Sequence, residues 1–107
     1  MFQLTGAGNE SANGYYAIDP GHPTHDGRQQ WRKMKEDGSF YSTSEQEEAE
    51  VYSTYNKRWF ICTGTSGVIY VTVVGTPLPP TDGWTHPKWG GTGPCPQLKW
   101  LSKSVCW

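Results

Sequence analysis

The part of the sequence that most constrains the fold runs from residue 51 to residue 74 and reads VYSTYNKRWFICTGTSGVIYVTVV. β-Branched and aromatic side chains fill most of its positions, and such side chains suit the pleated, half-buried surface of a sheet. Two short turns divide it, Asn56-Lys57 and the segment from Gly64 to Gly67, because Asn and Gly accept the backbone angles of tight turns. The sequence therefore predicts three consecutive strands, over residues 51–55, 59–63 and 68–74.

The third of these predicted strands is apolar on both faces. Along it, Val68, Tyr70 and Val74 alternate with Ile69, Val71 and Val73. A strand that is covered on both sides lies at the centre of a sheet or between two layers, and we expect that position for residues 68–74.

Length and composition point to a single all-β domain. A chain of 107 residues can form one hydrophobic core without disulfides or metals. Its 13 glycines and 8 prolines suit short strands and tight turns. Turn signals recur at a spacing of about eight to twelve residues, and no long helical period is present. We therefore predict a small antiparallel sandwich or partly open barrel of about six to eight short strands.

Further strands are predicted on either side of the central stretch. They are residues 2–5, 15–18, 28–35, 39–43 and 97–101. Gly6-Ala-Gly8, Asn13-Gly14 and Asp37-Gly38 are the turns expected between them. Residues 19–27 and 75–96 are rich in Pro and Gly, which predicts loops rather than strands.

The charges of the chain are nearly balanced. Nine basic and ten acidic residues give a net charge of −1, so no electrostatic signal for nucleic acid is present. Residues 45–50, EQEEAE, favour a solvated acidic loop over one turn of helix. No apolar run is long enough to span a membrane. The first residues lack the pattern of a signal peptide, which favours a cytoplasmic protein or a fragment of a longer chain.

The three cysteines have different expected roles. An odd number leaves at least one of them unpaired within the chain. Cys62 is expected to be a small buried apolar residue in mid-strand. Cys95 and Cys106 are far enough apart in sequence to bridge in an oxidising compartment, and whether they do so stays open.

Catalytic and metal-binding patterns are weak throughout. His22, His25 and Asp26 place two imidazoles and a carboxylate close together, but the proline between them favours a solvated loop over a metal site. Ser66 lacks the glycine pattern and the strand-to-helix context of a nucleophile elbow. A mid-strand cysteine such as Cys62 is usually inert. We therefore expect no enzyme activity, no cofactor and no metal.

Several short motifs together resemble a known family. They are GAG at 6–8, NGYY at 13–16, VYSTYNKRWFI at 51–61, VIYVT at 68–72, PPTDGW at 79–84 and GGTGPCPQL at 90–98. This order resembles a Trp/Gly-rich β module that recurs, often in tandem or beside signalling and scaffold domains, in protist, algal and marine-invertebrate proteins. The resemblance covers about residues 3–98, although Gln30-Trp31 stands where Pro-x-Tyr is usual. It implies a self-contained β unit used as a building block or contact surface, without an assigned activity.

The tryptophans are the best candidates for a binding surface. Trp59 is expected in the core, and Trp84 is expected to pack beneath the Pro-Pro-Thr-Asp-Gly turn that precedes it. Trp89 and Trp31 have polar or glycine neighbours and less reason to be buried. Exposed aromatic side chains provide large contact areas at small cost in entropy. The alternative is that all six tryptophans serve a small core.

Two classes of function follow from these observations. The first is a non-catalytic protein-interaction or structural β module, able to associate with itself or with a protein partner. The alternative is a small-ligand domain that binds carbohydrate. The candidate binding residues are Trp89, Trp31, Tyr15, Tyr41 and Trp107.

The C-terminal segment is expected to be a separate tail. We divide the chain into a β module over residues 1–98 and a tail over residues 99–107. The tail reads KWLSKSVCW, and its apolar side chains predict packing on the domain or on a neighbour.

Overall fold

The computed structural model describes most of the chain, and all structural statements refer to that part. It comprises residues 1–19, 21, 24–25, 28–41, 48–53, 58–64, 67–72, 76–87 and 93–101, with only the backbone of residue 25. The strands are β1 (Phe2–Thr5), β2 (Gly14–Ile18), β3 (Thr24–His25), β4 (Arg28–Gln29), β5 (Trp31–Met34), β6 (Ala49–Ser53), β7 (Trp59–Thr63), β8 (Gly67–Thr72), β9 (Trp84–Thr85) and β10 (Gln97–Trp100). One short 3-10 helix, η1 (Glu10–Ala12), lies between β1 and β2.

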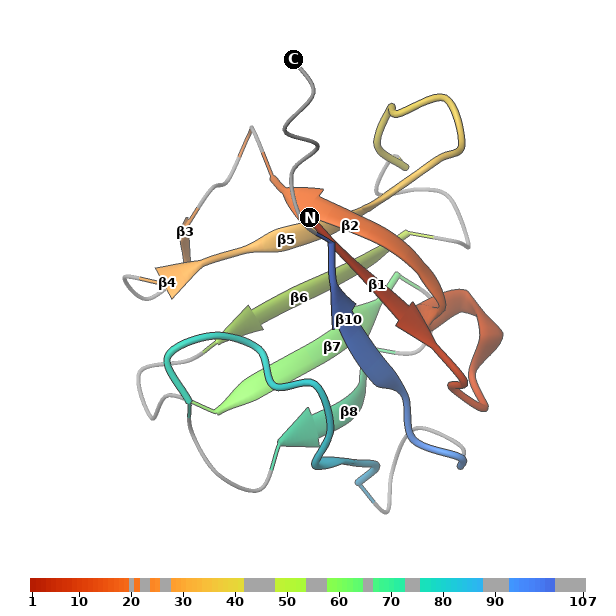
Figure 1. Ribbon diagram of the computed structural model, residues 1–107, viewed down its shortest axis with the longest axis vertical. Helices are drawn as coiled ribbons and strands as arrows, with labels where there is room; N and C mark the ends of the chain where they lie inside the picture. Colours follow the sequence, from red (N-terminus) through yellow and green to blue (C-terminus); the bar gives the residue numbers. More distant parts are fainter. Residues whose placement is uncertain are drawn as a thin grey trace.

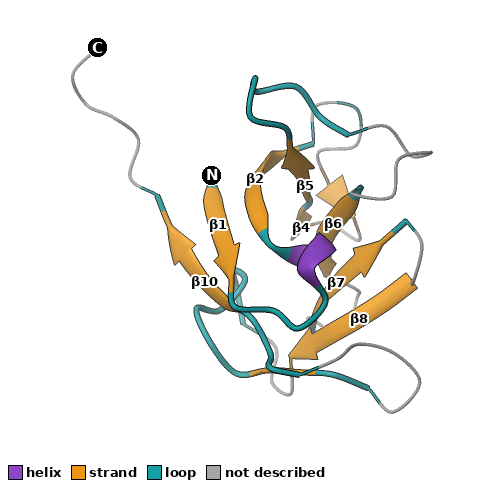
Figure 2. Ribbon diagram, turned by 90° about the vertical axis from the view of Figure 1, so that its right-hand side faces the viewer, coloured by secondary structure: helices purple, strands orange, loops and turns teal. Residues whose placement is uncertain are grey.

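Eight of the strands form one antiparallel sheet that curls into a nearly closed barrel (Figures 1 and 2). Its order is β10-β1-β2-β5-β6-β7-β8-β9, so the last long strand lies beside the first. The two-residue strands β3 and β4 form a separate small hairpin. This architecture confirms the predicted all-β fold, with a partly open barrel of eight strands.

Alternation of side chains builds the core of the barrel. In β5, β6 and β7 every second side chain is buried, and the residues between them are half-buried on the outer face. Strand pairing aligns Trp31, Val51 and Ile61 into one buried row, because directly opposite residues of antiparallel strands share a face. The period of two that predicted these strands therefore also fixes which residues fill the interior.

Aromatic rings fill much of that interior. Phe2 stacks on Tyr16, with ring centroids 5.2 Å apart, and its ring lies 5.6 Å from that of Trp31. Trp31 in turn lies 5.8 Å from Trp59. Rings at these separations attract one another beyond the burial of their area. The burial of Trp59 confirms its predicted place in the core.

The connection from β1 to β2 is closed by one asparagine. Asn13 accepts a hydrogen bond from the Ala7 N–H at 2.9 Å and donates its amide to the Ala7 carbonyl at 3.2 Å. Gly14 follows with φ of +148°, and a Cβ there would lie 2.7 Å from Cε of Lys33. Glycine is favoured at this position because other residues rarely adopt this φ, and an added Cβ would also displace the side chain of Lys33. The Asn13-Gly14 turn predicted from the sequence is part of this connection.

A bulge modifies the pairing of β7 with β8. Ile61 pairs with Tyr70, whereas the next residue, Cys62, pairs with Val68, so Ile69 is the extra residue. Ile69 and Tyr70 are consequently both buried although they are neighbours in sequence. In the described part, β8 lies near one end of the sheet order, next to the two-residue β9, rather than at the centre.

The loop after β8 packs under the barrel. The carbonyl of Thr76 accepts hydrogen bonds from Nε1 of Trp59 at 2.8 Å and from Nη1 of Arg28 at 3.0 Å. Nε1 of Trp84 donates to the carbonyl of Pro80 at 3.1 Å, and the Trp84 ring is buried. This confirms that Trp84 packs beneath its preceding turn. Trp84 also begins β9, a strand that the proline-rich sequence did not predict.

Three sequence expectations differ from the structure. In residues 39–43, the described part contains only an isolated bridge between Phe40 and Met34 rather than a strand. Glu48 is buried, so the expectation of a solvated acidic loop is wrong at that residue. The proposed division at residue 98 falls inside β10, because Lys99 and Trp100 pair with β1.

Other expectations lie outside the described residues. These are the Asn56-Lys57 turn, the acidic residues 45–47, Val73 and Val74, and the tail from residue 102 onwards. In the described part of the chain, no helix is both long and apolar enough to cross a membrane.

Candidate functional site

The structure buries Trp31, which the sequence marked as an exposed binding residue. Only 2% of Trp31 is exposed, and its ring packs against Phe2, Trp59 and Trp100. The expectation of exposure is wrong because Trp31 faces the interior in β5, whereas its polar neighbour Arg32 lies half-buried on the other face of that strand. Polar neighbours in sequence therefore do not indicate an exposed aromatic residue in a strand.

The two predicted tyrosines lie in different surroundings. Tyr15 is 48% exposed on β2 and pairs with Met34 of β5. Tyr41 follows β5, and the ammonium groups of Lys33 and Lys35 lie 5.3 and 5.5 Å from the centre of its ring. The other two candidates, Trp89 and Trp107, lie outside the described residues.

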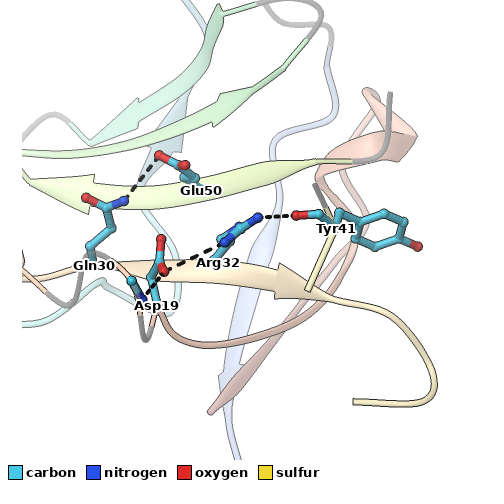
Figure 3. Close-up of polar contacts among 6 residues, drawn as sticks. Asp19, Gln30, Arg32, Tyr41 and Glu50 are labelled. Atoms are coloured by element: carbon cyan, nitrogen blue, oxygen red, sulfur yellow. Dashed lines mark hydrogen bonds and ion pairs between the residues drawn. The ribbon is translucent and has the colours of Figure 1, made fainter. Parts of the chain in front are cut away.

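A polar network that the sequence did not predict ties loops to β5 and β6 (Figure 3). Arg32 lies 3.8 Å from a carboxylate oxygen of the buried Asp19 and donates a hydrogen bond to the carbonyl of Tyr41. Gln30 donates to a carboxylate oxygen of Glu50 at 3.3 Å. The backbone N–H of Asp19 also donates to the Gln30 carbonyl at 3.0 Å. These contacts fix the ends of the segment that contains the β3–β4 hairpin.

Glu48 adds a third carboxyl group to this network. Burial, a hydrogen bond to Glu50 and the charge of Glu50 together raise its pKa from 4.5 to about 7, whereas Arg32 opposes the shift. Three carboxyl groups, those of Asp19, Glu48 and Glu50, therefore surround one guanidinium. A proton on Glu48 relieves the excess negative charge. The network is an electrostatic contact between loops and sheet.

The negative charges of this network also affect a side chain on the outer face of β7. Cys62 pairs with Glu50, and burial, followed by the charges of Glu50 and Glu48, raises the pKa of its thiol. Tyr52 stacks on Phe60 on the same face, with ring centroids 5.7 Å apart, and burial raises the pKa of the Tyr52 hydroxyl. A raised thiol pKa disfavours the thiolate, so Cys62 has the character of an inert cysteine.

Potential metal ligands and thiols occur in the described residues without forming a cluster. No group of three or more His, Cys, Asp or Glu side chains within them is placed to hold a metal ion. Cys62 and Cys95 are free thiols, while Cys106 lies outside the described part. His22, Asp26 and the side chain of His25 also lie outside it.

A pocket of about 400 Å³ opens beside β8 and β9. Its walls are Thr72, Thr76, Pro80, Asp82, Gly83, Trp84 and Thr85. The hydroxyl groups of Thr76 and Thr85 donate to backbone carbonyls, those of Leu78 and Val71 respectively. The exposed carboxylate of Asp82 is the charged group of this pocket.

The open side of the barrel leaves an edge on β10. The N–H of Leu98 donates to the carbonyl of Thr81 at 2.9 Å, whereas the N–H of Leu101 donates to Met1, next to β1, at 3.2 Å. Backbone N–H groups along a strand alternate in direction. The N–H of Trp100 therefore points the same way as the N–H of Leu98, away from β1. Outside the strand pairing, no backbone carbonyl of the described residues accepts a hydrogen bond from the N–H of Trp100.

Trp100 also presents its side chain at this edge. It is 36% exposed, the most exposed tryptophan in the described part of the chain, and its inner face packs against Phe2 and Trp31. An outward N–H and an exposed indole thus coincide at one residue of an edge strand. The apolar character of residues 99–107 was the sequence signal for this site. The direction of the Trp100 N–H could be known only from the register in which β10 pairs with β1.

Comparisons with known proteins add no relative. No family model matches the chain, and neither a curated protein nor a solved structure matches it. The resemblance to the Trp/Gly-rich module therefore stays a prediction.

Proposed function

We propose that this chain is a non-catalytic protein-interaction module that receives an extended segment of another polypeptide beside β10. The observation that carries this proposal is the outward N–H of Trp100, which lies on an edge strand beside an exposed indole. Extended segments bind edge strands through backbone hydrogen bonds, and side-chain contacts add selectivity.

The filling of the barrel supports an external binding surface. Phe2, Tyr16, Trp31 and Trp59 occupy the interior and contact one another. Barrels of this size hold either packed side chains or one small ligand inside, and here the rings take that space. Contacts with a partner therefore fall to the outer faces and to the edge.

Selection of displayed linear peptides on the immobilised chain tests this function. We expect selected peptides to slow hydrogen exchange at the Trp100 amide and to lose binding to the Trp100→Pro variant, which lacks that N–H. Trp100→Ala keeps the N–H and should retain part of the affinity, and thermal melting should verify that both variants fold. Leu78→Ala changes an exposed residue elsewhere and should bind normally. Peptides that bind Trp100→Pro as tightly as the unchanged chain would contradict the proposal.

Carbohydrate binding is a second candidate function, and the pocket beside β9 favours it. Its volume of about 400 Å³ lies within the range of about 300–1,000 Å³ typical of small-molecule sites. Pro80 offers apolar surface at the wall of this pocket, and Asp82 offers a carboxylate to accept hydrogen bonds from hydroxyl groups.

A glycan array followed by tryptophan-fluorescence titration tests this second function. Specific binding that Asp82→Asn weakens about tenfold or more would support it, given the usual value of hydrogen bonds to charged groups. The matched control is Asp37→Asn, because Asp37 is exposed but lies outside the pocket. An array without specific signals would remove this candidate.

A further inference from the structure

We infer that a second copy of this chain pairs with the β10 edge, so that the two Trp100 residues lie opposite each other across a two-fold axis. This inference rests on the proposed function, since it assigns the occupant of the same edge. It follows from three properties of β10: the direction of its backbone groups, its charge pattern and the exposure of its indole.

The backbone of β10 offers one residue suited to such an axis. Leu98 uses its outward N–H on the carbonyl of Thr81, and Lys99 directs its backbone groups towards β1. Trp100 is left with an outward N–H and an outward carbonyl. In an antiparallel pair, two opposite residues of this kind exchange both hydrogen bonds. The backbone N–H and carbonyl of Trp100 in one copy therefore bond with the carbonyl and N–H of Trp100 in the other.

The charge pattern supports the same register. With Trp100 opposite Trp100, each Lys99 faces Leu101 of the other copy. A register centred on Lys99 would instead place two lysines directly opposite, which is destabilising. It would also require the N–H of Leu98, which Thr81 already occupies. Among registers built from the described residues, the one centred on Trp100 avoids both conflicts.

The side chains add an apolar contact to these hydrogen bonds. Opposite residues share a face of the sheet, so the exposed parts of the two indoles meet beside Phe2 and Trp31. A four-residue strand buries less than the interface of about 1,200 Å² that stable complexes use, so the dimer should be weak and concentration-dependent.

Sedimentation combined with hydrogen exchange tests the pairing. Between about 5 and about 500 µM we expect the chain to pass from monomer to dimer. Over the same range the Trp100 amide should become protected, whereas the Leu98 amide should be protected throughout by Thr81. Leu98 therefore serves as an internal control in the same strand.

Two variants separate the backbone contribution from that of the side chain. Trp100→Pro should abolish the dimer because it removes the N–H, and Trp100→Ala should weaken it about tenfold or more through loss of the indole. Leu78→Ala, a change at another exposed apolar residue, should dimerise normally. Hydrogen exchange of the unchanged chain keeps the test decisive if either Trp100 variant fails to fold.

The possible outcomes distinguish this inference from the function on which it rests. A chain that stays monomeric over the whole range would overturn the self-pairing but leave the peptide edge intact, because peptide selection tests that edge separately. A dimer in which the Trp100 amide exchanges unchanged would also overturn the self-pairing. Protection of the Trp100 amide at the lowest concentration, where the chain is monomeric, would mean that a single chain covers its own edge, and both proposals would fail.

Discussion

Trp100 lies directly opposite Phe2 across the β1–β10 pair, with ring centroids 5.2 Å apart and ring planes inclined by 72°. The edge-to-face arrangement is one that aromatic pairs prefer. It joins the last described strand to the aromatic core through the first strand. Trp100 thus stabilises the barrel with one face of its indole while the rest remains exposed.

Replacing Trp100 by Ala should lower the stability of the monomer. Full truncation of a core tryptophan costs about 3–5 kcal/mol, and the partial exposure of Trp100 reduces this to roughly 2 kcal/mol. A loss of that size should lower the melting temperature by about 10 °C for a domain of this size. Thermal melting at a concentration that keeps the chain monomeric measures the effect. Leu78→Ala is the control, and an equal loss in both variants would contradict the packing role of Trp100.

Replacing Gly14 by Ala should destabilise the fold through backbone strain and through contact with the side chain of Lys33. The added Cβ would lie 2.7 Å from Cε of Lys33, at a φ of +148° that side chains rarely adopt. We expect a loss of roughly 2 kcal/mol in chemical denaturation. Gly38 also has a positive φ, but no atom lies within 4 Å of its Cβ position, so Gly38→Ala should report the backbone strain alone. Equal losses for Gly14→Ala and Gly38→Ala would show that Lys33 yields without cost.

Glu48 should make the fold less stable as the pH rises. Burial, followed by the hydrogen bond to Glu50 and its charge, raises the folded pKa from the ordinary 4.5 to about 7, so the folded state favours the protonated form. Below pH 4.5 Glu48 is protonated in both states and has no differential effect. Between about pH 4.5 and 7 Glu48 loses its proton in the unfolded state but keeps it in the folded state. The contribution of Glu48 to the free energy of folding therefore becomes increasingly unfavourable as the pH rises.

Glu48→Gln should remove this dependence. Denaturant unfolding at several pH values should give a shallower decline between pH 5 and 8 for Glu48→Gln than for the unchanged chain, with a gain in stability at pH 8. Glu36→Gln is the control, because Glu36 is exposed and lies outside the network. If Glu48→Gln and the unchanged chain decline in parallel, Glu48 does not titrate as described.

Cys62 should react slowly with thiol reagents in the folded protein. Burial and the charges of Glu50 and Glu48 raise the pKa of its thiol, which lowers the fraction of reactive thiolate. Alkylation by iodoacetamide at pH 8, mapped by peptide mass spectrometry, should be slower at Cys62 than in the denatured chain. Glu50→Gln should accelerate it, whereas Glu36→Gln should not. If Glu50→Gln leaves the alkylation rate of Cys62 unchanged, the charge of Glu50 is not the cause of the slow reaction.

Most strands could be predicted because their side chains alternate and turn residues separate them. Phe2–Thr5 and Trp59–Thr63 have the predicted bounds. Residues 28–35 were predicted as one strand but are divided at Gln30 into β4 and β5. The bulge at Ile69 and the two-residue β9 could not be predicted, because both depend on the register of neighbouring strands rather than on local pattern.

The candidate site was less predictable than the fold. Trp31 was expected outside because its neighbours are polar, but whether an alternating strand directs a residue inward depends on its partners across the sheet. Asp19, Glu48 and Arg32 lie far apart in sequence, and only the fold brings them together. The exposed edge at Trp100 likewise results from the direction of backbone hydrogen bonds, which residue types do not specify.

The pairing of β1 with β10 brings Met1 and Leu101 within one hydrogen bond of each other. The described chain therefore enters and leaves the barrel at the same place. A unit of this kind can be inserted into a surface loop of another protein without stretching its host, and domains with adjacent ends tolerate such insertion. For the same reason, a short linker from residue 101 to residue 1 would permit a circular permutant with new ends in one of the other connections.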